Sequence, residues 1–244
     1  MTKKEPFLFD DFKAALAELK TAIESGERYL LLTGESGTGK TTLIRTLSGE
    51  LDRCRYRPFY FNLSSLNPLG LARVLARSLR AKFGLTHPET VKAVSQALSE
   101  DHIRTLLWID EAQQLMDKTF NELKALVEFD LEGNTHLVVL VCGLPQLRDR
   151  LEAPQLFPFF RRFHCRVEIT GLRKEEARPF LLHHFGEQEA ARLKEESLSM
   201  LFEQSRGIPA LLVANFSSAL RHSPEGPIDA ESMNAILENH KLPY

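Results

Sequence analysis

The sequence lacks long apolar runs and has few cysteines, and each shortage removes a class of protein. No stretch approaches the roughly 20 apolar residues that span a bilayer, and the first six residues lack the apolar core of a signal peptide. The three cysteines lie far apart without a C-x-x-C pair, which argues against a disulfide framework or a zinc site. We therefore expect a cytoplasmic protein that makes no membrane contact.

Net charge is almost absent as well, at −2 over 244 residues, so the total gives no sign of nucleic-acid binding. The distribution is uneven, however. Residues 45–82 carry eight Arg or Lys against two acids, whereas residues 83–136 carry ten acids against four Arg or Lys. A basic region therefore lies next to an acidic one along the chain.

A complete G-x-x-x-x-G-K-[ST] phosphate loop lies between an apolar run of strand length (29–33) and a segment with helical spacing (41–47). Its backbone N–H groups and the following helix N-terminus suit phosphate oxygens. Lys40 would reach the β- and γ-phosphates, and the Thr41 hydroxyl would bind Mg²⁺. The sequence predicts that ATP binds with Mg²⁺ and that the nucleotide contacts Gly34, Glu35, Ser36, Gly37, Thr38, Gly39, Lys40, Thr41 and Thr42.

Four further apolar runs of strand length follow the loop and alternate with helical patterns, at 57–63, 105–109, 137–141 and 166–169. Such runs are typical of strands buried on both faces of a parallel sheet. Beyond Leu172 only helical patterns occur, over 174–185, 190–203, 210–222 and 229–242. The expected fold class is α/β, with a helix-flanked parallel core over 1–172 and a small all-helical lid over 173–244.

Two adjacent carboxylates, Asp110 and Glu111, end the apolar run that follows the loop by about 70 residues. Asp110 can hold Mg²⁺, as the Walker-B aspartate does. Glu111 can polarise an attacking water as general base. The alternative is a pair of acids that cap the next helix. The glutamate favours ring-forming ATPases over many P-loop kinases and small GTPases, which lack it.

Four motifs together carry a family resemblance: the phosphate loop, the D-E-A-Q run at 110–113, the G-L-P-Q-L-R run at 143–148, and Arg161-Arg162 before the last strand. Over roughly residues 6–240 the chain resembles the ExeA/TniB/TnsC-like branch of AAA+ P-loop ATPases. That branch contains ATPases of general secretion and ATP-dependent regulators of DNA transposition.

The resemblance implies an arginine finger at Arg162, with Arg161 as the adjacent alternative, acting on the nucleotide of a neighbouring subunit. ATP would then lie at the interfaces of a homo-oligomer, either a ring or a filament. The other possibility is that both arginines are solvated or form surface ion pairs. Family members often place a polar sensor where this chain has Gly143, a role that Gln146 could take, and an arginine where it has Ala210. Hydrolysis is therefore expected to be slow.

Arg73, Arg77 and Arg80 are spaced i, i+4, i+7 opposite an apolar helix face. Stacked in this way they could follow a phosphate backbone without reading base sequence. A solvated helix face is the alternative.

These observations favour an ATP-hydrolysing AAA+ regulator of DNA transposition that oligomerises on duplex DNA non-specifically and recruits or activates a transposase. A secretion ATPase of the ExeA type is expected to carry a membrane segment and an envelope domain, which this sequence lacks. A nucleotide-gated scaffold, or an adaptor that resembles helicase loaders, is the third hypothesis.

Overall fold

A computed structural model describes residues 5–62, 68–82, 84–100, 102–128, 136–223, 225–231 and 233–234. The chain forms two compact units. One comprises residues 15–34 and 43–168, and the other comprises residues 1–14, 35–42 and 169–244. The division expected at 172/173 stays a prediction, since residues from the start of the chain and from the phosphate loop belong to the same unit as the C-terminal helices.

A five-stranded sheet forms the core, in the order β2-β3-β4-β1-β5. The pairs β1–β4, β3–β4 and β2–β3 are all parallel. In the register, Leu31 of β1 and Ile109 of β3 both pair with Val141 of β4, so these strands end at the same edge. The strands are β1 (Tyr29–Gly34), β2 (Tyr56–Asn62), β3 (Arg104–Asp110), β4 (Leu137–Gly143) and β5 (Cys165–Ile169). The expected α/β fold with a parallel sheet is confirmed.

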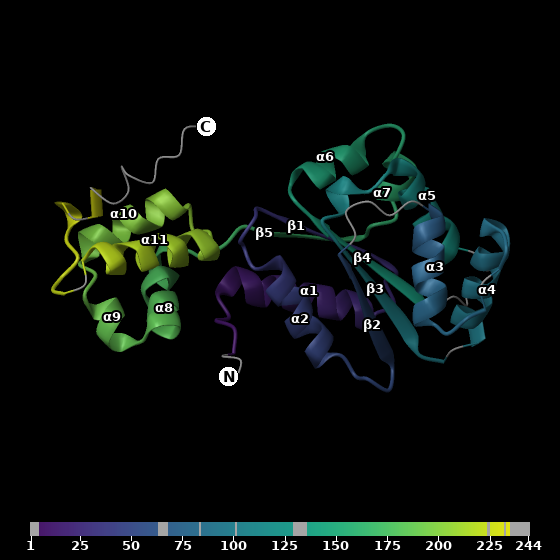
Figure 1. Cartoon of the computed structure of the whole chain (residues 1–244), viewed down its shortest axis with the longest axis horizontal. Helices are drawn as coiled ribbons and strands as arrows, with labels where there is room; N and C mark the ends of the chain where they lie inside the picture. The colour runs from purple at the N-terminus through teal and green to yellow at the C-terminus, as the bar shows by residue number, and fades with distance from the viewer. Residues whose placement is uncertain are drawn as a thin grey trace. The chain divides into compact units, whose positions relative to one another are not determined.

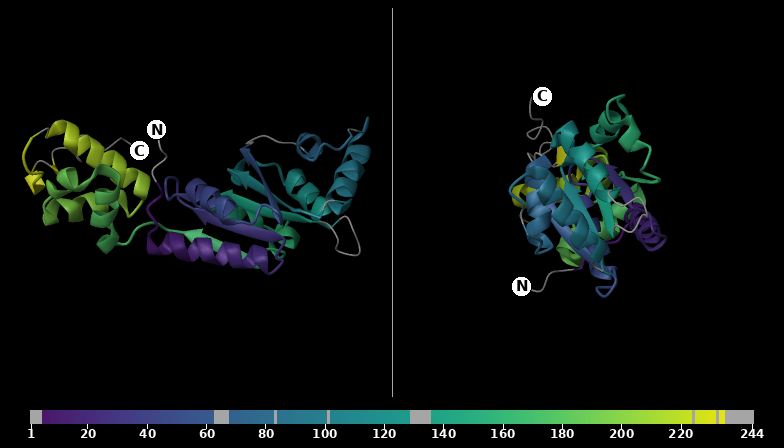
Figure 2. Two further views of the ribbon diagram at one scale, coloured as in Figure 1. Left: turned by 90° about the horizontal axis from the view of Figure 1, so that it is seen from below. Right: turned by 90° about the vertical axis from the view of Figure 1, so that its right-hand side faces the viewer.

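The central strands are buried on both faces, as their unbroken apolar runs predict. One face carries Leu31, Leu107, Ile109 and Val139, which belong to a core cluster with side chains of the helices that lie between β2 and β5 in the chain. The alternate positions, such as Leu30, point to the other face and are buried too. Figures 1 and 2 show helices of the same unit packed around the sheet.

The helices between the strands have the expected period. In chain order they are α1 (Asp10–Glu24), α2 (Lys40–Glu50), α3 (Pro68–Ser78), α4 (His87–Glu100), the 3₁₀ turn η1 (Ala112–Gln114), α5 (Asp117–Val127), α6 (Gln146–Glu152) and α7 (Phe157–Phe160). Helices α1 and α2 lie side by side, joined by an ion pair between Lys20 and Glu50 at 2.9 Å. Among the described residues, no helix is both long and apolar enough to cross a membrane.

The C-terminal region is helical as expected, with α8 (Lys174–Phe185), α9 (Glu187–Ala191), α10 (Glu195–Ser205) and α11 (Pro209–His222). The single helix expected over 190–203 is wrong. The chain leaves the helix at Arg192–Lys194, where Leu193 forms a parallel β-bridge with Ile228. The Leu193 carbonyl also accepts a hydrogen bond from Arg178 at 3.1 Å, so tertiary contacts break the helical pattern. Most of the helix expected over 229–242 falls outside the described residues.

Candidate nucleotide site

The phosphate loop leaves the carboxyl end of β1 and runs directly into α2. Gly37 and Gly39 have φ angles of 86° and 102°, which side-chain-bearing residues rarely adopt. Lys40 is 7% exposed, and its Nζ donates to the Glu35 carbonyl at 2.9 Å. The Thr38 hydroxyl donates to the same carbonyl at 2.9 Å. The loop is therefore folded around its own backbone, with glycines where the curvature needs them.

The first residues of α11 lie against this loop. The Ala210 amide donates to the Gly37 carbonyl at 3.2 Å. A Cβ added to Gly37 would come within 2.7 Å of the Ala210 Cβ and 3.2 Å of Ile208 Cγ2. The position where related ATPases carry a lid arginine is therefore occupied here by a small residue in direct contact with the loop.

Arg206 lies four residues before Ala210 and is the C-cap of α10, in a left-handed conformation with φ of 51°. Its side chain is exposed and makes no hydrogen bond or ion pair with any described residue. The expectation that hydrolysis is slow stays a prediction.

Asp110 is the last residue of β3 and Glu111 follows it, both in the other unit. Asp110 is 4% exposed, and its Oδ1 accepts the Glu111 amide at 3.0 Å. The Tyr60 hydroxyl lies 3.5 Å from its other carboxylate oxygen. Glu111 occupies the N-cap position of η1, but its side chain makes no capping hydrogen bond. The contacts of Glu111 therefore do not support the alternative in which the two acids cap the next helix.

Gln113 is a residue whose contacts the sequence did not reveal. Its Nε2 donates to Glu111 Oε2 at 2.6 Å, and its Oε1 accepts the Leu144 amide just beyond β4 at 3.2 Å. Gln146, considered from the sequence for a sensing role, is exposed at the start of α6 and makes no side-chain hydrogen bond among the described residues. The D-E-A-Q run contained Gln113, but nothing in its spacing indicated a contact with Leu144.

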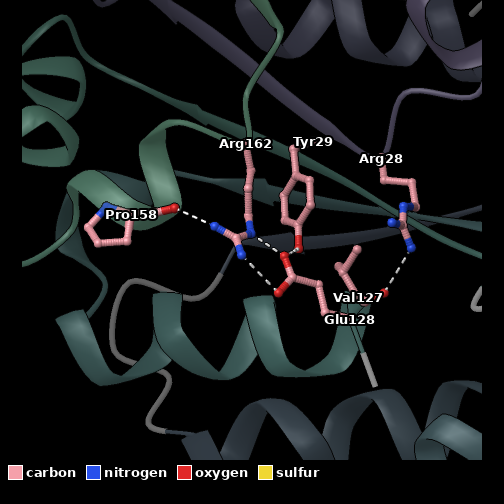
Figure 3. A network of polar contacts seen from close by, with 6 residues as sticks. All are labelled: Arg28, Tyr29, Val127, Glu128, Pro158 and Arg162. Atoms are coloured by element: carbon pink, nitrogen blue, oxygen red, sulfur yellow. Dashed lines mark hydrogen bonds and ion pairs between the residues drawn. The ribbon is translucent and has the colours of Figure 1, made fainter. Parts of the chain in front are cut away.

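The two arginines at 161 and 162 differ sharply in their surroundings. Figure 3 shows those of Arg162. Arg162 contacts both carboxylate oxygens of Glu128, through Nε and through Nη2, the latter at 3.1 Å, and its Nη1 donates to the Pro158 carbonyl at 2.6 Å. The Tyr29 hydroxyl donates to the same carboxylate at 3.1 Å. Arg161 is exposed and makes no polar side-chain contact within the described part of the chain. Of the pair, only Arg161 has a guanidinium without a polar contact to the residues that the structure describes.

These contacts shift the ionisation of each group in the Arg162–Glu128 pair. The hydrogen bond from Arg162 to Glu128, with the carboxylate's charge, raises the arginine pKa above its usual value. Burial alone would raise the pKa of Glu128, but the hydrogen bond and the charge of Arg162 outweigh it and leave that pKa lowered. Burial and the charge of Glu128 raise the pKa of Tyr29. The pair is charged at neutral pH. Glu128 carried no sequence signal beyond being an acid after a helix.

The expected arginine stack is only partly correct. Arg73 and Arg77 lie on α3 and are exposed, opposite the buried Leu71 and Leu75. Helix α3 ends at Ser78, however, and Arg80 follows in a left-handed conformation with φ of 56°. It therefore does not continue the stack, because the chain has already left the helix.

Within the described ranges, no group of three or more His, Cys, Asp and Glu side chains could hold a metal ion by itself. His183 directs its Nε2 at the Glu5 carbonyl at 2.8 Å.

Comparison with known proteins places these features in a family. The family described as AAA domain matches residues 23–151. The general secretion pathway protein A of Aeromonas hydrophila is 28% identical over 212 residues, which cover 81% of this chain and 37% of that protein. The chain thus spans little more than a third of this curated relative.

Solved structures share the fold at lower identity. Cdc6p from Pyrobaculum aerophilum matches with a TM-score of 0.69 at 16% identity, covering 98% of this chain and 69% of that one. The ORC1 protein of Aeropyrum pernix, solved in complex with DNA, matches with a TM-score of 0.61 at 18% identity, covering 98% of this chain and 68% of its own. At these identities the likeness shows the fold alone.

Proposed function

The chain belongs to the AAA domain family of P-loop ATPases, and we propose that it is an ATP-dependent regulator of DNA transposition. It hydrolyses ATP with Mg²⁺, assembles as a homo-oligomer on duplex DNA without reading base sequence, and recruits or activates a transposase. The observation that carries the DNA-binding part is the exposed pair Arg73 and Arg77 on α3, within a region rich in basic residues.

The phosphate loop suits nucleotide phosphates. Gly37 leaves the loop curved at a place where a Cβ would meet Ala210, and α2, eleven residues long, begins within the loop. Backbone amides at a helix N-terminus favour an anion. Lys40 would exchange the Glu35 carbonyl for phosphate oxygens, and Thr41 would bind Mg²⁺ through its hydroxyl. Bound Mg²⁺ neutralises charge on the β- and γ-phosphates.

Asp110 and Glu111 supply the carboxylates for hydrolysis. Asp110 is buried at the end of β3 and would hold the cation. Glu111 would accept a proton from water as the water oxygen bonds to the γ-phosphorus. The bond from that phosphorus to the bridging oxygen then breaks, and the products are ADP and phosphate.

Arg161 is the better candidate for a finger that acts on a neighbouring subunit. Each nitrogen of the Arg162 guanidinium already donates to Glu128 or to Pro158, so using Arg162 would require breaking these contacts. Arg161 is one residue away and exposed. A free planar cation can stabilise the charge that develops on the transferred phosphoryl group.

One comparison supports a second candidate function. The similarity to a general secretion pathway protein supports an ATPase of secretion, in which the same hydrolytic residues would act without DNA. DNA binding separates the two functions. The shared ATPase chemistry does not.

Duplex DNA binding is tested by gel shift with a non-hydrolysable ATP analogue on two unrelated duplexes. We expect equal binding to both, and we expect the double variant R73E/R77E to abolish it. The matched control K92E/K118E makes the same change in net charge at two exposed lysines of α4 and α5. For every phosphate that a variant no longer neutralises, the slope of log K against log salt should fall by about 0.9. Absence of DNA binding at low salt would leave the ATPase standing and favour the secretion function.

The trans role of Arg161 is tested by mixing subunits. R161A and E111Q are each expected to be inactive alone, and R161A subunits should bind ATP normally, since no nucleotide-binding residue is altered. Mixing the two variants should restore ATP hydrolysis, because an R161A subunit keeps Glu111 and can take its finger from an E111Q neighbour. A mixture that stays inactive would show that Arg161 does not act between subunits.

A further inference from the structure

The side chain of Gln113 joins two parts of the sheet edge at which β3 and β4 end. Its Nε2 donates to Glu111 Oε2 at 2.6 Å, and its Oε1 accepts the Leu144 amide at 3.2 Å. A carboxylate can only accept and a backbone amide can only donate. The two partners therefore fix which end of the Gln113 amide faces which neighbour.

The backbone of Gln113 is held by separate contacts. Its carbonyl accepts a hydrogen bond from Arg150 Nη1 at 2.7 Å, and Arg150 Nη2 contacts Asp117 Oδ1 at 2.5 Å. The Arg150 guanidinium also lies over the Phe120 ring, 5.4 Å from its centre. With its main chain anchored to α6 in this way, Gln113 can release Glu111 only by turning its side chain.

Gly143, the last residue of β4, leaves the space that the Gln113 amide fills. A Cβ at Gly143 would come within 2.4 Å of Gln113 Oε1 and 2.8 Å of Leu147 Cδ2. Gly143 does not have a positive φ, so its backbone does not itself require glycine. The neighbouring amide, together with Leu147, accounts for the missing side chain at this position.

Glu111 needs such a partner because its own backbone is unusual. It is one of three non-glycine residues with positive φ in the described part of the chain, at φ 53° and ψ 36°. Few side-chain-bearing residues adopt this region, and the contacts around them must hold them there. Its amide donates to Asp110, and its carboxylate is held by Gln113.

We propose that Gln113 is the positioning residue of Glu111 and couples the carboxylate to the carboxyl end of β4. The proposal rests on the general-base role given to Glu111 above. One carboxylate oxygen accepts a hydrogen bond from the Gln113 amide, which leaves the other to accept a proton from water. A shift of Leu144 would break the amide's second hydrogen bond, and the carboxylate would lose its fixed direction. The polar group missing from position 143 is thus supplied by Gln113.

The first test compares Q113A with Q114A by steady-state ATP hydrolysis and by nucleotide affinity. Gln114 is exposed in the same turn, and its side chain makes no hydrogen bond among the described residues, so Q114A is the matched control. We expect kcat of Q113A to fall about tenfold to a hundredfold, since a misdirected base loses much of its contribution. KM, ATP affinity and the unfolding midpoint should stay near wild type. Unchanged kcat, or an equal loss of affinity and turnover, would overturn the proposal.

The second test uses Q113E, which keeps the acceptor for Leu144 but places a second carboxyl against Glu111. Two carboxyl groups this close do not both ionise readily, so one pKa rises. The acid limb of the kcat profile should move up by about one pH unit or more, with activity partly recovered at higher pH. An unmoved limb would show that position 113 does not lie against the group that titrates in kcat, and that result would refute the coupling.

The third test is a cycle between G143A and Q113A. The added methyl group should displace the Gln113 amide, so G143A should reproduce the low kcat of Q113A. The double variant should be little worse than either single variant, because both remove the same interaction. Multiplying losses would show that the two residues act separately. E111Q identifies the failing premise: if it still hydrolyses ATP at the wild-type rate, the base is elsewhere and the proposed chemistry fails before Gln113 is at issue.

Discussion

The contact between Arg162 and Glu128 should measurably stabilise the unit that contains the sheet, whereas Arg161 should not. Arg162 uses three nitrogens on Glu128 and Pro158, and Tyr29 donates to the same carboxylate. The side chains of the pair are 33% and 31% exposed. Exposed pairs contribute about 0.2–1 kcal/mol, and breaking a fully buried pair costs about 3–5 kcal/mol. For this half-buried fork we expect R162A to cost about 2 kcal/mol.

Urea unfolding followed by tryptophan fluorescence measures this cost. Trp108 is the only tryptophan, it is 4% exposed, and it lies on β3 in the same unit as Arg162 and Glu128. In a chain of this size, a stability decrease of about 2 kcal/mol also lowers the melting temperature by about 4–8 °C. R161A, the adjacent control at an exposed position, should stay within about 0.5 kcal/mol of wild type.

A double-mutant cycle separates the pair from its surroundings. E128Q keeps the volume of Glu128 but loses its charge, and the double variant R162A/E128Q should be less destabilised than the sum of the two single variants. We expect a coupling of about 1–2 kcal/mol, since the residues share hydrogen bonds. If R162A were as stable as R161A, or if the losses simply added, Arg162 would not be held by Glu128, and Arg161 would have no advantage over it as the finger.

Three further predictions follow from single features. The pKa of Glu128 is lowered in the folded protein, so the stability contributed by its charged form is complete above about pH 4.3, its unfolded pKa, and is lost as pH falls through the folded pKa. The difference in free energy of unfolding between wild type and E128Q, measured by urea unfolding, should therefore close in acid. A constant difference would contradict this. Cys54 is exposed and Cys142 is buried, while burial raises the pKa of Cys165 to about 11. A thiol reagent at pH 7.5 should therefore modify one cysteine in the native protein and three in urea, which mass spectrometry can count. G37A should lose ATP binding, because the φ of 86° at Gly37 and the nearby Ala210 exclude a Cβ. The control is G49A on α2, where a Cβ meets nothing within 4 Å. Normal ATP binding by G37A would show that the loop tolerates the change.

The sheet could be predicted from the sequence because its strands are local patterns. The run Leu137 to Val141 is apolar and β-branched, which fits a strand covered on both faces, and it became the start of β4. The phosphate loop and Asp110–Glu111 were found in the same way, since each is a short motif next to such a run. Helix ends were harder to predict. Arg80 continued the spacing of Arg73 and Arg77, but the helix had already ended at Ser78.

Contacts between residues distant in sequence could not be predicted. Gln113 contacts Leu144 across 31 positions, and Glu128 contacts Arg162 across 34. Each depends on which strands become neighbours, and the order β2-β3-β4-β1-β5 is not written in any one segment. Gly143 illustrates the difficulty: in the sequence it indicated a missing sensor, whereas in the fold it makes room for a polar group from the turn after β3.

Arg161 and Arg162 show why residue type alone cannot assign a role at this site. They are adjacent, they carry the same charge, and the family resemblance accepts either as the finger. In the fold, Arg162 lies against the carboxylate at the end of α5, and Arg161 does not. The same helix begins at Asp117, which contacts Arg150, the residue that anchors Gln113. Helix α5 is therefore held at one end by contacts that fix the turn next to Arg161, and at the other by contacts that fix the partner of Glu111. A substitution at either end of α5 therefore changes the geometry proposed for hydrolysis and leaves in place every side chain proposed to act on ATP.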